Sequence, residues 1–87
     1  MKVVNLLKEH YNMYIGRGSR FGNPFRIGKD GDREEVIRKY EIYARNHLIN
    51  AISSIPKEAI LGCYCKPKAC HGDVIIKIWK ELHNEKR

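Results

Sequence analysis

The chain has 87 residues, 43% of them hydrophobic and 31% charged, which is typical of one globular domain and excludes a disordered segment. Seventeen Lys and Arg against ten Asp and Glu give a formal net charge of +7, which favours nucleotides, other phosphorylated molecules or nucleic acid as partners. Apolar runs are far shorter than the about 20 residues of a membrane span, and the N-terminus is charged too early for a signal peptide, so we expect a cytoplasmic protein with no membrane partner.

Three short runs have the composition of β-strands. The first two lie near the N-terminus, over residues 3–7 and 11–15, and the second is rich in β-forming residues and stopped by a glycine. The third, over 59–64, is a continuous apolar run of the kind found in buried strands. Between the second strand and the helix that follows, Gly16–Asp32 holds five of the seven glycines, so we expect a loop there.

Two helices complete the predicted structure. Apolar residues recur at steps of three and four from Asp32 to Ile55, where Pro56 ends the pattern, and we expect a kink near Asn46. A last amphipathic helix is predicted to begin near Gly72 or at the residue after it, with one apolar face.

The order of elements is β-β-loop-α-β-α. It predicts a small α/β domain over residues 1–87, with a sheet of three or four strands, partly parallel, a long central helix and a C-terminal helix. Ligands bind such sheets beyond the carboxyl ends of the strands. The loop 16–32 follows the second strand and the turn 65–72 follows the third, so we expect the two segments to meet as one anion-binding site.

The glycine loop has the composition of an anion-binding segment. Glycine lets backbone N–H groups approach an anion, hydroxyl and guanidinium groups add donors, and an Asn amide can reach a base or sugar. The predicted ligand-binding residues are Gly16, Arg17, Gly18, Ser19, Arg20, Asn23 and Arg26. The alternative is a turn-rich connection with solvated arginines. Of its two phenylalanines, Phe25 is expected in the core, whereas Phe21 is left open between core and ligand stacking.

The turn 63–73 allows three interpretations. In the first, Cys63, Cys65, Cys70 and His71 are four zinc ligands, although all lie within nine residues of each other. In the second, Cys70, His71 and Asp73 are catalytic, because a helix N-terminus and nearby cations lower the pKa of a thiol. In the third, the cysteines are buried hydrophobes, His71 is a hydrogen-bonded structural residue and Asp73 caps the last helix. The third is favoured for Cys63 alone.

Two separated regions resemble those of a domain-of-unknown-function family, family 4326 (DUF4326), over about residues 13–80. The first region contributes 14–19, 21–25 and 31–36 with Tyr40, and the second contributes 62–65 and 70–74. Tyr64 stands where relatives often carry Trp, and the Cys-His end is more distantly similar to the Cys-His-Arg motif of family 488, with Gly72 in place of the arginine. The resemblance supports pairing the two regions but implies no particular reaction. The small phage-encoded members of the family imply a role in nucleotide metabolism or host-defence evasion.

These observations lead to one functional prediction and one alternative. The prediction is a small cytoplasmic domain that binds, and by extension processes or sequesters, a nucleotide-like phosphorylated molecule, with no cofactor. The alternative is a zinc-stabilised nucleic-acid-binding module. Whether the protein is an enzyme stays open, and so small a core is compatible with a homodimer.

Overall fold

We analysed a computed structural model that describes residues 1–84. Its three strands and three helices follow one another in the predicted order, with the expected central helix divided in two. The elements are β1 (Lys2–Asn5), β2 (Met13–Tyr14), α1 (Arg33–His47), α2 (Ile49–Ser53), β3 (Ile60–Cys63) and α3 (His71–His83).

The three strands form one parallel sheet in the order β1-β3-β2. The central strand β3 aligns Leu61 with Val3 of β1, and Gly62 with Tyr14 of β2. The predicted small α/β fold is confirmed, and the partly parallel sheet proves to be parallel in both of its described pairings. Because β2 and β3 are parallel neighbours, their carboxyl ends lie at the same edge of the sheet.

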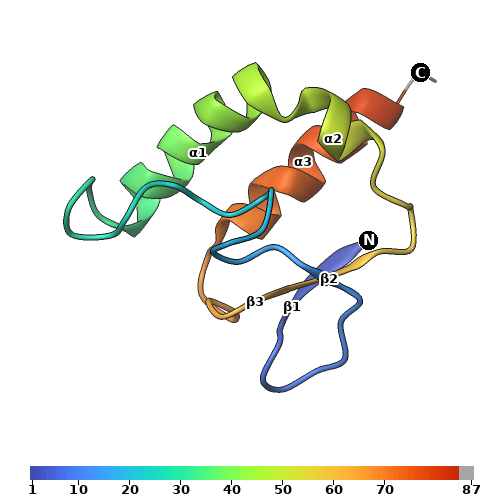
Figure 1. Ribbon diagram of the computed structural model, residues 1–87, viewed down its shortest axis with the longest axis horizontal. Coiled ribbons are helices and arrows are strands. Elements are labelled where there is room, and N and C mark those ends of the chain that lie inside the picture. The colour runs from blue at the N-terminus through green and yellow to red at the C-terminus, as the bar shows by residue number, and fades with distance from the viewer. Residues whose placement is uncertain (85–87) are drawn as a thin grey trace.

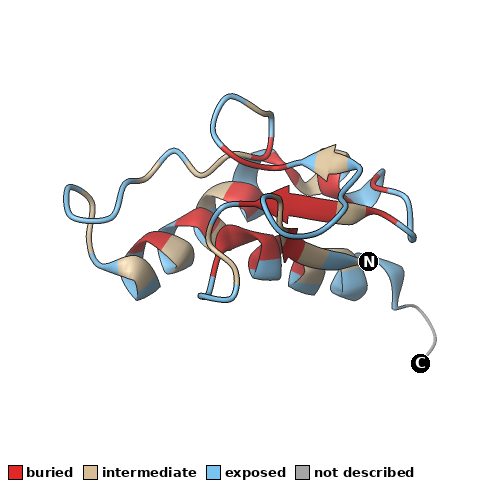
Figure 2. Ribbon diagram, turned by 90° about the horizontal axis from the view of Figure 1, so that it is seen from below, coloured by how far each residue is buried: buried red, intermediate tan, exposed pale blue. Residues whose placement is uncertain are grey.

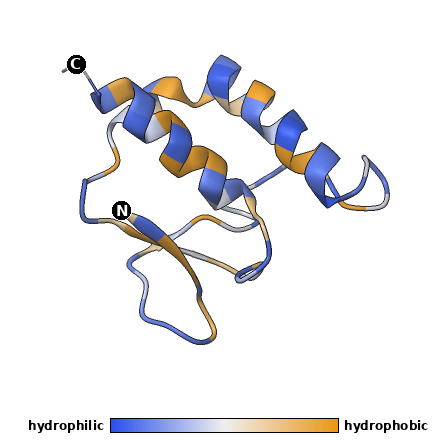
Figure 3. Cartoon of the chain, turned by 180° about the vertical axis from the view of Figure 1, so that it is seen from behind, coloured by the Kyte–Doolittle hydropathy of each residue, from blue (hydrophilic) through white to orange (hydrophobic). Residues whose placement is uncertain are grey.

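All three helices lie on one side of the sheet, and the loop 6–12 that joins β1 to β2 leaves on the other side (Figure 1). The buried residues follow the layer between helices and strands (Figure 2). Apolar and polar segments alternate along α1 and α3, as amphipathic helices require (Figure 3). The largest fully buried side chains are Tyr40, Ile15, Ile52, Leu61, Ile75, Ile78, Cys63 and Cys70. Within residues 1–84, no helix is long and apolar enough to cross a membrane.

The start of α1 is fixed by a capping box. Oδ1 of Asp32 accepts a hydrogen bond from the Glu35 N–H at 2.9 Å, and Oε1 of Glu35 accepts one from the Asp32 N–H at 3.0 Å. The helix ends at Leu48, whose backbone (φ −121°, ψ 8°) separates α1 from α2. The expected kink near Asn46 is therefore confirmed, two residues further on.

The start of α3 uses a cysteine as its cap. Cys70 is the N-cap residue, and its Sγ accepts a hydrogen bond from the Gly72 N–H at 3.2 Å. Asp73 accepts one from the Cys70 N–H at 3.1 Å. Asp73 is thus the N3 member of a capping box and not the N-cap residue, and the helix starts one residue before the predicted Gly72.

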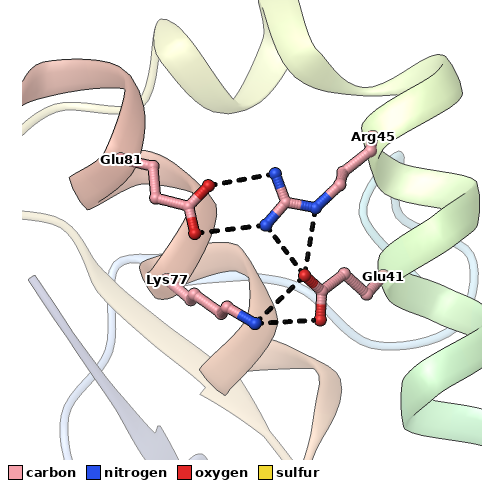
Figure 4. Close-up of polar contacts among 4 residues, drawn as sticks. All are labelled: Glu41, Arg45, Lys77 and Glu81. Atoms are coloured by element: carbon pink, nitrogen blue, oxygen red, sulfur yellow. Dashed lines mark hydrogen bonds and ion pairs between the residues drawn. The ribbon is translucent and has the colours of Figure 1, made fainter.

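A four-residue ion-pair network joins α1 to α3 on the outer surface (Figure 4). Arg45 bonds Glu41 at 2.8 Å and Glu81 at 3.0 Å, and Lys77 lies 3.1 Å from Glu41. Hydrogen bonds from Arg45 lower the pKa of Glu81, and those from Arg45 and Lys77 lower the pKa of Glu41. Their side chains are between 26% and 56% exposed, so solvent screening weakens the pairs.

The network predicts an acid-sensitive contribution to stability. Because the folded-state pKa of Glu41 is lowered, its contribution is complete above the unfolded pKa of about 4.3 and is lost as the pH falls through the folded value. Urea unfolding should show Glu41→Gln to be less stable than wild type by at most about 1 kcal/mol near neutral pH, with the difference shrinking toward about pH 3. Glu58→Gln, an exposed loop variant, is the control; a difference that grows on acidification would contradict this account.

Candidate functional site

The two predicted segments meet at a cavity of about 170 Å³. It lies where β2 and β3 end, and the starts of α1 and α3 complete its wall. We call it the arginine cavity. Its lining residues are Gly16, Arg17, Asn23, Phe25, Ile27, Arg33, Val36, Ile37, Cys63, Tyr64, Cys65, Ala69, Cys70 and His71. The juxtaposition follows from the parallel pairing of β2 with β3, as the sequence predicted.

Two guanidinium groups from different segments line the cavity. Nη1 of Arg17, on the glycine loop, donates to the carbonyl oxygen of Asn23 at 3.3 Å. Nη1 of Arg33, the first residue of α1, donates to the carbonyl oxygen of Ala69 at 3.0 Å. Within residues 1–84 neither arginine forms an ion pair, and no lining residue is an Asp or Glu. Both positive charges therefore stay without a counter-ion.

Asn23 and Phe25, from the glycine loop, form another part of the cavity wall. Nδ2 of Asn23 donates to the Val36 carbonyl at 3.3 Å, and its Oδ1 accepts from the Phe25 N–H at 2.9 Å. Asn23 thus holds the glycine loop against α1. The Phe25 ring meets the edge of Tyr43 at 6.4 Å and is half-buried on the cavity wall, whereas Phe21 is buried in the core.

Four of the predicted ligand-binding residues lie outside the lining of the cavity. Ser19 is used within the loop, because its Oγ donates to the Gly16 carbonyl at 2.7 Å. Gly18 is exposed with φ +90°, a turn conformation that favours glycine. Arg20 lines a separate shallow groove beside α2, and Arg26 is exposed, its N–H bonded to Asp30.

His71 lies at the base of the cavity and is 8% exposed. Its Nε2 is 2.6 Å from the Ile15 carbonyl oxygen, which can only accept, so Nε2 carries the proton. Burial lowers the pKa of His71, and the nearby Arg17 lowers it further, so the ring is neutral at pH 7. Nδ1 of His71 has no hydrogen-bond partner among residues 1–84. Every fully buried side-chain nitrogen or oxygen in that range has a partner, so Nδ1 keeps contact with solvent and is a free acceptor.

The cysteines differ from one another. Sγ of Cys63 and Sγ of Cys70 are 3.1 Å apart and buried, while Cys65 is half-buried on the cavity wall. Burial, followed by the hydrogen bond with Cys63, raises the pKa of Cys70 to about 12, the opposite of the lowering expected from its helix-terminal position. Cys70 is therefore a protonated thiol at neutral pH.

The proposed zinc ligands Cys63, Cys65, Cys70 and His71 all line the cavity. In the described part of the chain, no three His, Cys, Asp or Glu side chains are placed to hold a metal ion together. The Nε2 of His71 is turned to the Ile15 carbonyl. Asp73, the third predicted catalytic residue, is outside the lining and forms an ion pair with Lys66 at 2.7 Å.

Arg33 is the main cavity residue that was not predicted from the sequence. Its spacing of three and four residues to Val36 and Ile37, which belong to the inward stripe of α1, was the available signal. Tyr64 and Ala69 were also missed, and no pattern in the sequence distinguishes them from other turn residues.

Known proteins are similar to this chain over nearly its whole length. The chain is 37% identical over 90 residues to a relative from Enterobacteria phage T4, described as an uncharacterized 12.4 kDa protein in the nrdA-td intergenic region, covering 97% of this chain and 82% of that protein. No solved structure matches. The model of the family described as a domain of unknown function, DUF4326, matches residues 3–81. The chain therefore belongs to the DUF4326 family.

Proposed function

We propose that the arginine cavity binds a nucleotide-like phosphorylated small molecule. The observation that carries the proposal is the pair of guanidinium groups, Arg17 and Arg33, which line one cavity without a carboxylate among its walls. Uncompensated arginines are well suited to phosphate, because each can donate two parallel hydrogen bonds to its oxygens.

The rest of the wall supports a ligand with an apolar or flat part. Phe25, Ile27 and Ile37 supply an apolar surface, and Tyr64 adds an aromatic ring. The volume of about 170 Å³ is below the about 300–1,000 Å³ of cavities that enclose drug-sized ligands, so a bound nucleotide would lie partly outside the cavity. Nδ1 of His71 can accept a hydrogen bond from a hydroxyl or amino group of the ligand.

The state of the thiols favours binding over thiolate chemistry. A nucleophilic cysteine needs a lowered pKa, whereas the pKa of Cys70 is raised to about 12. The neutral His71 keeps proton transfer open as a second activity, since a neutral imidazole with one free nitrogen is a general base. Capture of a nucleotide, with His71 as an acceptor, is the function that these residues support best.

A thermal-shift screen of nucleoside monophosphates, cyclic nucleotides and inorganic phosphate against the wild-type protein tests the proposal. A ligand at about 100 times its dissociation constant stabilises the folded protein by about 2.7 kcal/mol. For a domain of this size that corresponds to a rise in Tm of about 10–20 °C. The proposal fails if no nucleotide raises Tm, or if the corresponding nucleosides without phosphate raise it equally.

The zinc-stabilised nucleic-acid-binding module stays a prediction, and it has its own test. Elemental analysis of protein purified without chelator should then show one zinc per chain, and removal of that zinc should lower Tm sharply, because structural zinc contributes directly to folding. If the metal content is far below one per chain and chelators leave Tm unchanged, the zinc alternative is wrong.

A further inference from the structure

The sheet has a second face, turned away from the helices (Figure 1). Side chains alternate between the two faces along a strand, and paired residues share a face. Leu61 belongs to the core beneath the helices, so its partner Val3 faces the helices as well. Gly62 and its two partners, Val4 of β1 and Tyr14 of β2, therefore face away.

Two tyrosine rings on this side are packed against glycines. A Cβ at Gly62 would lie 2.6 Å from Cγ of Tyr11, and a Cβ at Gly16 would lie 2.6 Å from Cε1 of Tyr14, so each ring occupies space that only glycine leaves open. The Tyr14 hydroxyl also donates to the Arg17 carbonyl at 2.9 Å. Each residue nevertheless stays 36–37% exposed. The rings are thus held in place while part of their surface faces solvent.

A third tyrosine lies at the end of β3, two residues after Gly62. Tyr64 is 61% exposed and also lines the arginine cavity. Among residues 1–84, none of the rings of Tyr11, Tyr14 and Tyr64 stacks on another aromatic ring. We call these three residues the tyrosine face. The exposed part of each ring is open to an external partner.

Positive charge accompanies the tyrosine face. Lys2 lies two residues before Val4 on the same side of β1, and Lys68 lies in the turn after β3. Arg17 accepts the Tyr14 hydroxyl bond on its carbonyl, and its guanidinium lines the adjoining arginine cavity. All three are exposed and form no ion pair within the described residues, whereas Lys66 is paired with Asp73.

We propose that the tyrosine face binds single-stranded nucleic acid, with bases stacked on the tyrosines and phosphates near the three cations. Stacking on aromatic rings requires unstacked bases, which a single strand offers and a duplex does not. The net charge of +7 complements a phosphate backbone and disfavours a basic or neutral peptide on the same surface. The proposed surface adjoins the arginine cavity, because Arg17 and Tyr64 also line the cavity, whereas Tyr11 and Tyr14 do not.

Fluorescence anisotropy with labelled single strands of about 12 nucleotides, one of DNA and one of RNA, tests the proposal on the full chain. We expect saturable binding whose logarithmic affinity falls with the logarithm of salt with a slope of about −2, as for about three phosphate contacts. A duplex of the same length should bind at least about tenfold more weakly. The two arms show whether DNA, RNA or both are bound.

Matched variants separate stacking from folding and from the cavity. Tyr14→Ala should lower the affinity about tenfold, whereas Tyr14→Phe, which keeps the ring and loses the hydroxyl bond, should retain most of it. Tyr64→Ala should also lower it, while Ile42→Ala, at a position that is 60% exposed on α1, should not. Arg33→Ala should leave strand binding unchanged even where it weakens nucleotide binding.

Several outcomes would overturn the proposal: no binding of either strand, a duplex bound as tightly, Tyr14→Ala and Tyr64→Ala both equal to wild type, or a loss in Arg33→Ala that matches the loss in Tyr14→Ala. The last would show that the strand is held by the cavity. Binding of an acidic peptide in preference to both strands would assign the surface to a protein partner. Circular dichroism of every variant confirms that the fold is intact.

Discussion

Replacing both cavity arginines, Arg17→Ala with Arg33→Ala, is expected to abolish nucleotide binding at concentrations that saturate the wild-type protein. Each arginine would donate charge-assisted hydrogen bonds to the phosphate, worth about 1.5–3 kcal/mol apiece. Each single variant should therefore lose affinity about tenfold or more, and the double variant about a hundredfold or more. Isothermal titration with the nucleotide that gives the largest thermal shift measures the loss.

The matched control for this experiment is Arg20→Ala. Arg20 comes from the same glycine loop but lines the groove beside α2, so its loss should leave nucleotide affinity within about twofold of wild type. Each cavity arginine makes one hydrogen bond, to a carbonyl oxygen, so the unliganded variants should lose no more than about 1 kcal/mol of stability. Equal losses of affinity in Arg20→Ala and Arg33→Ala would mean that general surface charge, and not the cavity, attracts the ligand.

Tyr40→Ala is expected to destabilise the folded protein more than the arginine substitutions do, lowering the free energy of unfolding by about 3–5 kcal/mol. Tyr40 is fully buried, and its hydroxyl donates to the Phe21 carbonyl at 2.8 Å. Its ring meets His71 edge-on at 5.0 Å. Tyr40 therefore ties α1 to the glycine loop and to the base of the cavity, and its removal leaves a void among all three. Urea unfolding measures the loss.

Tyr40→Phe separates the two roles of this side chain. It keeps the packing but leaves the Phe21 carbonyl without its donor, at a cost of about 1–2 kcal/mol. Nucleotide affinity should fall slightly, since the glycine loop is less firmly held. If Tyr40→Ala costs less than Tyr40→Phe, the core around α1 is not packed as described.

The fold was predictable where periodicity is strong and less so where strands are short. The helical stripe from 32 to 55 and the apolar run 59–64 each gave the correct element. The second strand was expected over 11–15 but spans only Met13–Tyr14, because the Asn12 side chain accepts the Ile60 N–H bond at 2.9 Å as the chain returns from the loop. Such a return depends on contacts between distant residues, which local propensity does not encode.

The location of the candidate site was predictable from the sequence, but the residues that line it were less so. A glycine loop and a turn after parallel strands must meet, and they do. Neighbouring arginines in an irregular loop point in directions that no periodicity sets, so Arg17 and Arg20 could not be told apart. The pKa of Cys70 depends on burial, which outweighs the helix terminus and is known only from the packed structure.

The central claim, that two distant segments form one anion site, is tested most directly by amide NMR of the wild-type protein during titration with a nucleoside monophosphate. The account predicts saturable shifts that cluster at Gly16, Arg17, Arg33, Cys65 and His71, from both segments and from the start of α1. Shifts confined to one segment, or centred on Arg20 and Asn50 in the groove beside α2, would contradict it.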